Sequence, residues 1–289
     1  MDITITGIVL VSAVLHPFRE LMIKKNMFPE SAYFACILLW VVFAAVHSVI
    51  LGFDLWSAAA VWPLVLFSCL GVFLYYMGTM ETIKRGDVSV YYPIMRSSPL
   101  PVVVLGFLAL GHRYSLTMLG GIALVLIGAF FLQYKRGTRL FRQPLVMLTA
   151  LGALAGSGVY SLSDAEAMRT VEPMVFLFWV NVLVVLCSAI YIMVMKSPGR
   201  SHLTHLFGGW RQTPVMYLMA GLSSYASYYL ILTAFQMGGN VAAVTSVRQV
   251  SVPLAVILGG LYLKEADTRN RLLWAFMLAA GVVVIVLAR

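Results

Sequence analysis

Two arginines, Arg96 and Arg248, stand within segments of the sequence that are otherwise apolar enough to lie inside a membrane. A charge at the centre of a membrane helix costs about 2.5–3.5 kcal/mol on insertion scales, so an intramembrane charge points to a function. A guanidinium stays protonated and donates paired hydrogen bonds to a carboxylate or a phosphate. We therefore expect the two arginines to face one cavity and to bind an anionic or zwitterionic solute.

Polar residues at helical spacing extend this candidate site. They lie beside the arginines or one helical turn away, and we expect them to line the same cavity: Tyr92, Thr245, Gln249 and Ser251. Pro99 follows Arg96 by three residues, and because proline has no backbone donor it loosens the preceding turn and leaves carbonyl oxygens for water or solute. An alternative stays open, in which Pro99, Pro101 and Pro253 only shape the helix bundle.

Another pair of polar residues, Tyr76 and Tyr228, has tyrosine neighbours at Tyr75 and Tyr229. Their rings and hydroxyl groups could form an aromatic floor for the solute. Tyrosine is also enriched at membrane interfaces, so an anchoring role for this pair stays open.

The arginines also have a purely structural interpretation. Acidic residues such as Glu20, Glu81 or Asp164 could neutralise them, so that they only fix the register of the helices. The sequence argues against this interpretation, because these acids are predicted near helix ends and no carboxylate stands one turn from either arginine on its own helix. We expect an incoming anion to supply the negative charge.

These residues stand in a chain with the composition of a membrane protein. Of its 289 residues, 61% are hydrophobic and 11% are charged, whereas soluble domains carry about 25% charged residues. Ten apolar segments of about 20 residues can each cross a hydrocarbon core of about 30 Å. We place them at Ile3–Met22, Ala32–Gly52, Ala59–Thr82, Val88–Leu110, Leu116–Gln133, Leu145–Glu166, Met174–Met195, Val215–Phe235, Val241–Leu263 and Arg271–Ala288. The predicted fold class is an all-α integral membrane protein with ten transmembrane helices and no soluble catalytic domain.

The basic residues predict the orientation of the chain. Arg19, Arg96 and Arg248 are predicted to lie within or near the membrane. Of the remaining 17 Lys and Arg, 14 fall on one side of the membrane and three on the other. In membrane proteins the cytoplasmic loops carry the excess of Lys and Arg. The loops after the first, third, fifth, seventh and ninth predicted helices are therefore predicted in the cytoplasm, and both termini outside. We expect a bacterial inner (plasma) membrane. Orientation then explains the net charge of +9, and no nucleic-acid partner is expected.

A shift of 152 residues superimposes the two halves of the sequence without a gap. The paired residues include Tyr76 and Tyr228, Gly86 and Gly238, Arg96 and Arg248, Pro101 and Pro253, and Leu126 and Leu278. We divide the chain into residues 1–137 and 138–289, with five predicted helices in each part. Because five is an odd number, the second copy must be inverted relative to the first, and such repeats are typical of carriers that work by alternating access.

Residues 75–132 and 228–287, which carry most of these matches, resemble the paired EamA-type domains of the drug/metabolite transporter superfamily. The matching features are Gly86 and Gly238 after the third helix, the proline-bearing fourth helix, and the turns Gly111–Arg113 and Lys264–Glu265. The first turn has His112 and Arg113 where the family commonly has an acid. The resemblance covers essentially the whole chain and implies a ten-helix transporter. It says little about the substrate, since members carry amino acids, nucleotide sugars, sugar phosphates or drugs.

A carrier that is driven by an ion gradient needs a side chain that changes charge. His16, four residues before Glu20 in the first predicted helix, is the best titratable candidate. Glu20 and Glu81 are further candidates, and His47 competes with them. Uniport or exchange would need no such group, so coupling stays open.

The function we expect is secondary transport of a small organic anion or zwitterion, of carboxylate, phosphate ester or amino acid type. A flippase for a phosphate-headed lipid is the main alternative, because two arginines at different depths could pass the head group across the membrane. An intramembrane enzyme is less well supported, since HExxH, GxSxG and paired aspartate motifs are absent from the sequence. We expect no catalytic residue, no cofactor and no metal.

Overall fold

The computed structural model describes residues 1–24, 29–85, 91, 94–133, 143–194, 206–254 and 268–288, and among these the side chains outside 17–24, 29–30, 83–84, 133 and 268–272. The elements in this part of the chain are all helices: α1 (Ile3–Lys24), α2 (Pro29–Leu51), the 3₁₀ helix η1 (Leu55–Val61), α3 (Trp62–Arg85), α5 (Pro99–Leu110), α6 (Leu116–Gln133), α7 (Pro144–Ala167), α8 (Pro173–Val194), α10 (Pro214–Gln236), α11 (Val241–Val247), the 3₁₀ helix η2 (Arg248–Val250) and α13 (Thr268–Leu287). The prediction of an all-α fold is confirmed.

Within the described residues, five helical segments are long and apolar enough to cross a membrane. They are Ser31–Leu51, Leu55–Thr82, Pro144–Ala167, Pro173–Val194 and Pro214–Gln236. Shorter apolar helices accompany them at Ile3–His16, Pro99–Leu110, Leu116–Leu132 and Leu273–Leu287. The boundary that we placed between residues 137 and 138 lies outside the described residues, as do parts of the predicted spans Val88–Leu110 and Val241–Leu263.

The distribution of polar and apolar side chains is the reverse of that in a soluble domain. Large apolar side chains face outward along most helices, with Ile50 75% and Phe276 74% exposed. Serine hydroxyls are instead buried, among them those of Ser12, Ser68 and Ser161. An extended apolar exterior over a partly polar interior fits a lipid environment, which supports a membrane protein.

Proline and glycine fix several helix ends. Proline is the first residue of α2, α5, α7, α8 and α10, where its missing N–H would have no partner inside the helix and its fixed φ suits the first turn. Gly238, which the 152-residue shift pairs with Gly86, follows α10 and has a φ of 86°. This left-handed conformation is easily reached by glycine, and it ends α10 and allows the chain to turn toward α11. Gly86 itself lies outside the described residues.

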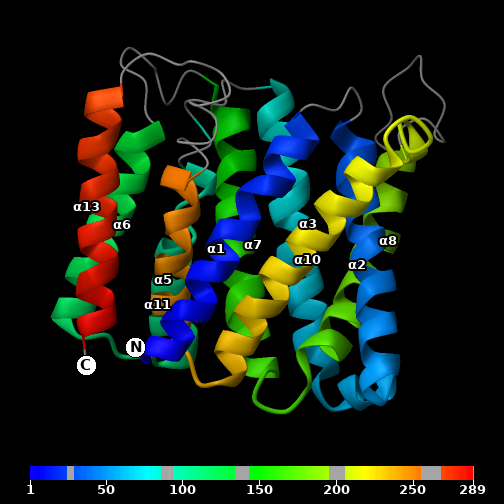
Figure 1. Cartoon of the computed structure of the whole chain (residues 1–289), viewed down its shortest axis with the longest axis horizontal. Coiled ribbons are helices and arrows are strands. Elements are labelled where there is room, and N and C mark those ends of the chain that lie inside the picture. Colours follow the sequence, from blue (N-terminus) through cyan, green and yellow to red (C-terminus); the bar gives the residue numbers. More distant parts are fainter. Residues whose placement is uncertain are drawn as a thin grey trace.

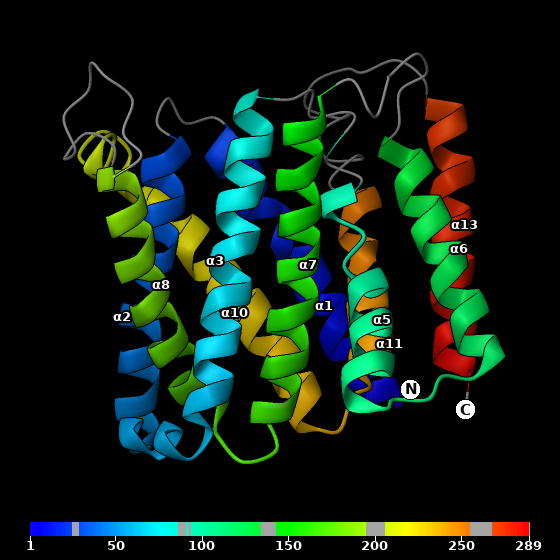
Figure 2. The ribbon, with the colours of Figure 1, turned by 180° about the vertical axis from the view of Figure 1, so that it is seen from behind.

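The helices form an elongated bundle (Figures 1 and 2), with α6 and α13 at one end and α2 and α8 at the other. Between them, α3 packs along α7 and α1 packs along α10. In addition α3 contacts α8, and α10 contacts α2. Helices from the beginning of the chain therefore pack mainly against helices from its second half.

Small residues allow the backbones of paired helices to approach closely. At the crossing of α3 and α7, a Cβ atom added to Gly156 would lie 2.6 Å from the carbonyl oxygen of Gly71. At the crossing of α6 and α13, a Cβ added to Gly281 would lie 2.7 Å from the carbonyl oxygen of Gly121. Such contacts are typical of helix pairs in membranes, where close packing replaces the hydrophobic effect as the source of association.

The two termini lie on the same face of the bundle, the lower one in Figure 1. The amino group of Met1 donates a hydrogen bond to the carbonyl oxygen of Val286, at 3.0 Å. Such a placement is typical of a chain with an even number of membrane crossings.

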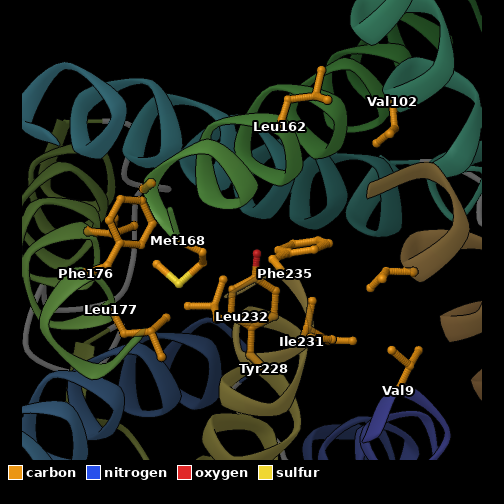
Figure 3. Packing of buried hydrophobic residues seen from close by; sticks show 14 of the residues in the cluster. Val9, Val102, Leu162, Met168, Phe176, Leu177, Tyr228, Ile231, Leu232 and Phe235 are labelled. Atoms are coloured by element: carbon orange, nitrogen blue, oxygen red, sulfur yellow. The ribbon is translucent and has the colours of Figure 1, made fainter. Parts of the chain in front are cut away.

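One apolar cluster runs through the centre of the bundle and contains side chains from α1, α2, α3, α5, α6, α7, α8, α10, α11 and α13. Figure 3 shows part of it, with Phe235 and Leu232 of α10 beside Tyr228, and with Phe176 of α8 and Leu162 of α7 among the other members. Tyr228 is thus held by the core on one side, and its hydroxyl group belongs to the site described next.

Candidate functional site

A cavity with an empty volume of about 780 Å³, part of it open to the outside, lies between helices of the two halves. Its apolar lining includes Trp40, Val72, Met95, Phe176, Leu177 and Val180. Its polar lining consists of His16, Ser68, Tyr75, Tyr76, Arg96, Ser98, Tyr160, Asp164, Asn181, Tyr228, Arg248, Gln249 and Ser251. The structure therefore brings Arg96 and Arg248 to a single cavity.

Arg96 lies where the helical chain is interrupted, between the helical residues Ile94 and Met95 and the start of α5 at Pro99. Its carbonyl oxygen accepts a hydrogen bond from Nε2 of Gln249 at 2.7 Å. The carbonyl is available to Gln249 because the N–H of Leu100 bonds to Ser97 instead, at 2.9 Å. This carbonyl group near Pro99 is thus released from the helix, and its bond to Gln249 joins Arg96 to the second half of the chain.

The guanidinium group of Arg96 borders the cavity beside His16. Nη1 of Arg96 lies 3.4 Å from Nε2 of His16. His16 is 7% exposed and comes from α1, so it is buried beside the arginine although the two residues are 80 positions apart.

Arg248 is the first residue of η2, the 3₁₀ turn that follows α11. Its Cζ lies 5.2 Å from the centroid of the Tyr228 ring, a distance suited to a cation–π contact. Among the described side chains, none provides a carboxylate within 4.0 Å of the Arg248 guanidinium. Arg248 thus contributes a positive charge to the cavity that no described acid contacts directly.

Asp164 lies in the same cavity and corrects our argument from the sequence, which placed this acid near a helix end and away from the arginines. It is 1% exposed. One carboxylate oxygen accepts a hydrogen bond from Ser68 Oγ at 2.5 Å, and the other accepts one from the hydroxyl group of Tyr228. Asp164 stands in the last turn of α7, but its side chain is buried between α3 and α10, which supply these two donors.

Aromatic rings form one wall of the cavity. The indole of Trp40 stacks on Tyr228 with ring centroids 5.5 Å apart. Tyr160 meets Tyr228 edge to face at 6.1 Å and Tyr75 at 5.9 Å, while Tyr75 lies 5.7 Å from Tyr76. Tyr76 and Tyr228 therefore belong to a continuous aromatic wall of the cavity, as the aromatic-floor hypothesis requires.

Of the other residues proposed from the sequence, Gln249 and Ser251 line the cavity. Thr245 does not: its hydroxyl donates to the carbonyl oxygen of Val241 at 2.8 Å, within its own helix. Glu81 also lies away from the cavity, where it pairs with Arg85 at 2.8 Å and accepts a hydrogen bond from Tyr191. The side chains of Tyr92 and Glu20 lie outside the described residues.

Several lining residues were not proposed from the sequence, above all Asp164, Ser68, Tyr160 and Asn181. A signal for Asp164 was present, because Ser157, Ser161 and Asp164 are spaced by four and three residues and form a polar stripe on one face of α7. No comparable local pattern marks Ser68 or Asn181.

No family model matches the chain, and no curated protein is similar to it. Among solved structures, 29 chains are similar. One of them, described as "Crystal structure of protein", has a TM-score of 0.78 and 16% sequence identity, with 99% of each chain covered. At this identity the likeness concerns the fold alone, and it shows that the whole chain has an arrangement of helices found in a crystal structure.

Proposed function

We propose that this chain is a secondary transporter that moves a small organic anion or zwitterion across a membrane by alternating access. The observation that carries the proposal is that Arg96 and Arg248, which the 152-residue shift superimposes, line one cavity. Both stand at interruptions of regular α-helix, where backbone and side chain can meet a solute. The solute would be a carboxylate, a phosphate ester or an amino acid held by bidentate hydrogen bonds.

The charges of the cavity support an anionic solute. The described lining has two guanidinium groups, those of Arg96 and Arg248, and one carboxyl group, that of Asp164. No described carboxylate lies within 4.0 Å of the Arg248 guanidinium, and an incoming anion would supply one. A zwitterion would place its negative end on the arginines and its positive end toward Asp164 and the aromatic wall.

The helix pairings support an inverted repeat. By their order in each half, α1 corresponds to α7, α2 to α8, α3 to α10 and α6 to α13. Exchanging the halves turns the α3–α7 contact into the α10–α1 contact and the α3–α8 contact into the α10–α2 contact, while α2–α8 and α6–α13 map onto themselves. Reciprocal pairing of this kind is expected of a carrier whose halves rock around a central site. It also agrees with the EamA-type resemblance of the sequence.

The test is binding and transport by purified protein with four probes: pyruvate, glutamate, glycerol phosphate and phosphatidic acid in mixed micelles. At least one of the first three should raise the melting temperature of the wild type and enter proteoliposomes, because a bound solute stabilises by mass action. Arg96→Ala and Arg248→Ala should each abolish both effects, and the lysine variants should weaken them because the bidentate fork is lost.

Arg169→Ala is the matched control, since Arg169 is an exposed arginine that pairs with Glu166 at 3.0 Å outside the cavity. It should behave as the wild type does. Undiminished uptake by both alanine variants of the cavity arginines would overturn the proposal, and stabilisation by phosphatidic acid alone would favour the lipid flippase instead.

A further inference from the structure

The carboxylate of Asp164 connects two pairs of helices. Within the α3–α7 pair, it accepts the hydrogen bond from Ser68. The bond from Tyr228 comes from α10, which is paired with α1 through two hydrogen bonds between Ser12 and Ser227. Asp164 is therefore placed where the α3–α7 pair meets the α1–α10 pair, and a change in its charge acts on the contact between them.

Ser68 and Tyr228 can hydrogen-bond to Asp164 whether its carboxyl group is ionised or protonated. A hydroxyl group donates one hydrogen bond and accepts others. Toward the carboxylate, Ser68 and Tyr228 both donate. Toward the carboxylic acid, one of them can turn its own proton away and accept the O–H of Asp164. Both partners can thus stay hydrogen-bonded to Asp164 whether its carboxyl group holds a proton or not.

Phenol groups from the neighbouring helices face the same part of the cavity. Tyr75 and Tyr76 come from α3, Tyr160 from α7 itself, and Tyr228 from α10. A phenol can donate a hydrogen bond to Asp164, as Tyr228 does, but it brings no positive charge to the carboxylate.

The charged and titratable neighbours are Arg248 from η2, Arg96 from the interruption before α5, and His16 from α1. None of the described cations lies within 4.0 Å of the Asp164 carboxylate. Arg248 acts on it from across the ring of Tyr228, since its Cζ lies 5.2 Å from that ring and the hydroxyl of the same ring donates to Asp164. A solute anion bound to Arg248 would bring a second negative charge toward Asp164, and the repulsion favours uptake of a proton.

On the basis of the transport function proposed above, we propose that Asp164 is the proton-binding site of the carrier and that one proton moves with each solute anion. The proton binds to a carboxylate oxygen of Asp164 from the side on which the anion enters, and it leaves that oxygen on the other side. Proton and anion each strengthen the binding of the other, because the coupling between two sites is reciprocal. A monoanion and its proton then cross together without net charge.

His16, the candidate favoured by the sequence, is less well placed for this role. Its Nε2 lies 3.4 Å from Nη1 of Arg96, so a proton added to His16 would be repelled by the charge of Arg96. A proton on His16 would also leave the repulsion between the bound anion and Asp164 in place. Glu81 lies outside the cavity, paired with Arg85.

The first experiment needs no variant. Pyruvate or glutamate is added to purified wild-type protein in weak buffer at pH 7 to 8, where neither probe buffers, and the pH is followed with an indicator dye. We expect uptake of up to one proton per bound anion, greater at the higher pH. Stabilisation by the probe without proton uptake would overturn the proton site while leaving the transport proposal in place, and absence of stabilisation by both probes and by glycerol phosphate would count against the transport proposal itself.

The second experiment uses proteoliposomes and compares two rates for each protein, accumulation driven by a pH gradient and exchange of solute without a gradient. In Asp164→Asn the ratio of driven accumulation to exchange should fall at least tenfold. Tyr228→Phe should lower it less, because the Ser68 bond remains. Glu166→Gln is the matched control, as this acid stands two residues away, half-exposed and paired with Arg169. A wild-type ratio in Asp164→Asn, or wild-type accumulation that does not respond to the gradient, would overturn the inference.

Discussion

Ser12 and Ser227 exchange hydrogen bonds across the crossing of α1 and α10. The hydroxyl of Ser12 donates to the carbonyl oxygen of Ser227 at 2.7 Å, and the hydroxyl of Ser227 donates to the carbonyl oxygen of Ser12 at 2.9 Å. Both residues are buried. The reciprocal bonds hold the two backbones at a fixed distance and join the first helix of one half to the third helix of the other.

Removing this pair should weaken the bundle moderately. Hydrogen bonds between membrane helices contribute about 0.6 kcal/mol on average and up to about 1.7 kcal/mol, so we expect Ser12→Ala with Ser227→Ala to lower the free energy of unfolding by about 1–2 kcal/mol. Thermal unfolding in detergent measures the effect. Ser223→Ala is the control on the same helix, because the Ser223 hydroxyl donates only to Ala220 one turn away. An equal loss in the control would show that the α1–α10 bonds do not matter.

A methyl group at Gly121 should destabilise the pairing of α6 and α13. Its Cβ would lie 2.8 Å from Cγ1 of Ile285 and 3.0 Å from the carbonyl oxygen of Gly281. Overpacking of this kind costs about 1–3 kcal/mol, so Gly121→Ala should melt at a lower temperature than the wild type. Gly120→Ala adds the same methyl group at a position with no atom within 4 Å, and it should melt as the wild type does. Identical melting of the two variants would contradict the close crossing.

Replacing Gln249 should weaken anion binding without removing a charge. Gln249→Leu takes away the donor to the Arg96 carbonyl at 2.7 Å and to Ser98 Oγ at 3.1 Å. Leaving a buried acceptor without this donor costs about 1–3 kcal/mol, and because the Arg96 backbone then shifts, we expect roughly a tenfold loss of affinity for the stabilising probe. Ser98→Ala removes only the longer bond and should lose less. Thermal-shift titration measures both affinities, and a greater loss in Ser98→Ala would contradict this role of Gln249.

The termini should face the outside of the cell. The basic residues predict this orientation, and Met1 and Val286 share one end of the bundle. A reporter enzyme that is active only outside the cytoplasm should work when fused after Arg289 and should fail when fused after Val194, at the far end of α8. Activity of the Val194 fusion alone would reverse the predicted orientation.

Helix positions could largely be predicted from the sequence, because membrane helices are marked by apolar runs and by proline at their starts. The predicted Leu116–Gln133 coincides with α6, and the predicted Leu145–Glu166 differs from α7 by one residue at each end. The exception is the fourth helix. Its apolar run continues through Arg96, but prolines at 99 and 101 remove the backbone donors that would carry the helix across this point.

Only some residues of the candidate site could be predicted from the sequence. Arg96 and Arg248 could be found because a charge in an apolar run is a local signal. The placement of Asp164 depends on Ser68 and Tyr228, donors from two other helices, and so on packing that spacing along one helix does not reveal. Thr245 was assigned to the cavity from its spacing to Arg248, whereas its hydroxyl group bonds to the carbonyl oxygens of Val241 and Ala242 within α11.

The α3–α7 and α1–α10 crossings have equivalent positions in the two halves but differ in chemistry. Where α3 meets α7, Gly71 and Gly156 bring backbone against backbone, and where α1 meets α10 the serine pair intervenes. In a carrier that opens by loosening one of these crossings at a time, the inward-facing and outward-facing conformations would then differ in free energy. The solute concentration for half-maximal transport should accordingly be unequal on the two faces of the membrane. Such a carrier would transport in both directions but would saturate at a lower solute concentration from one side.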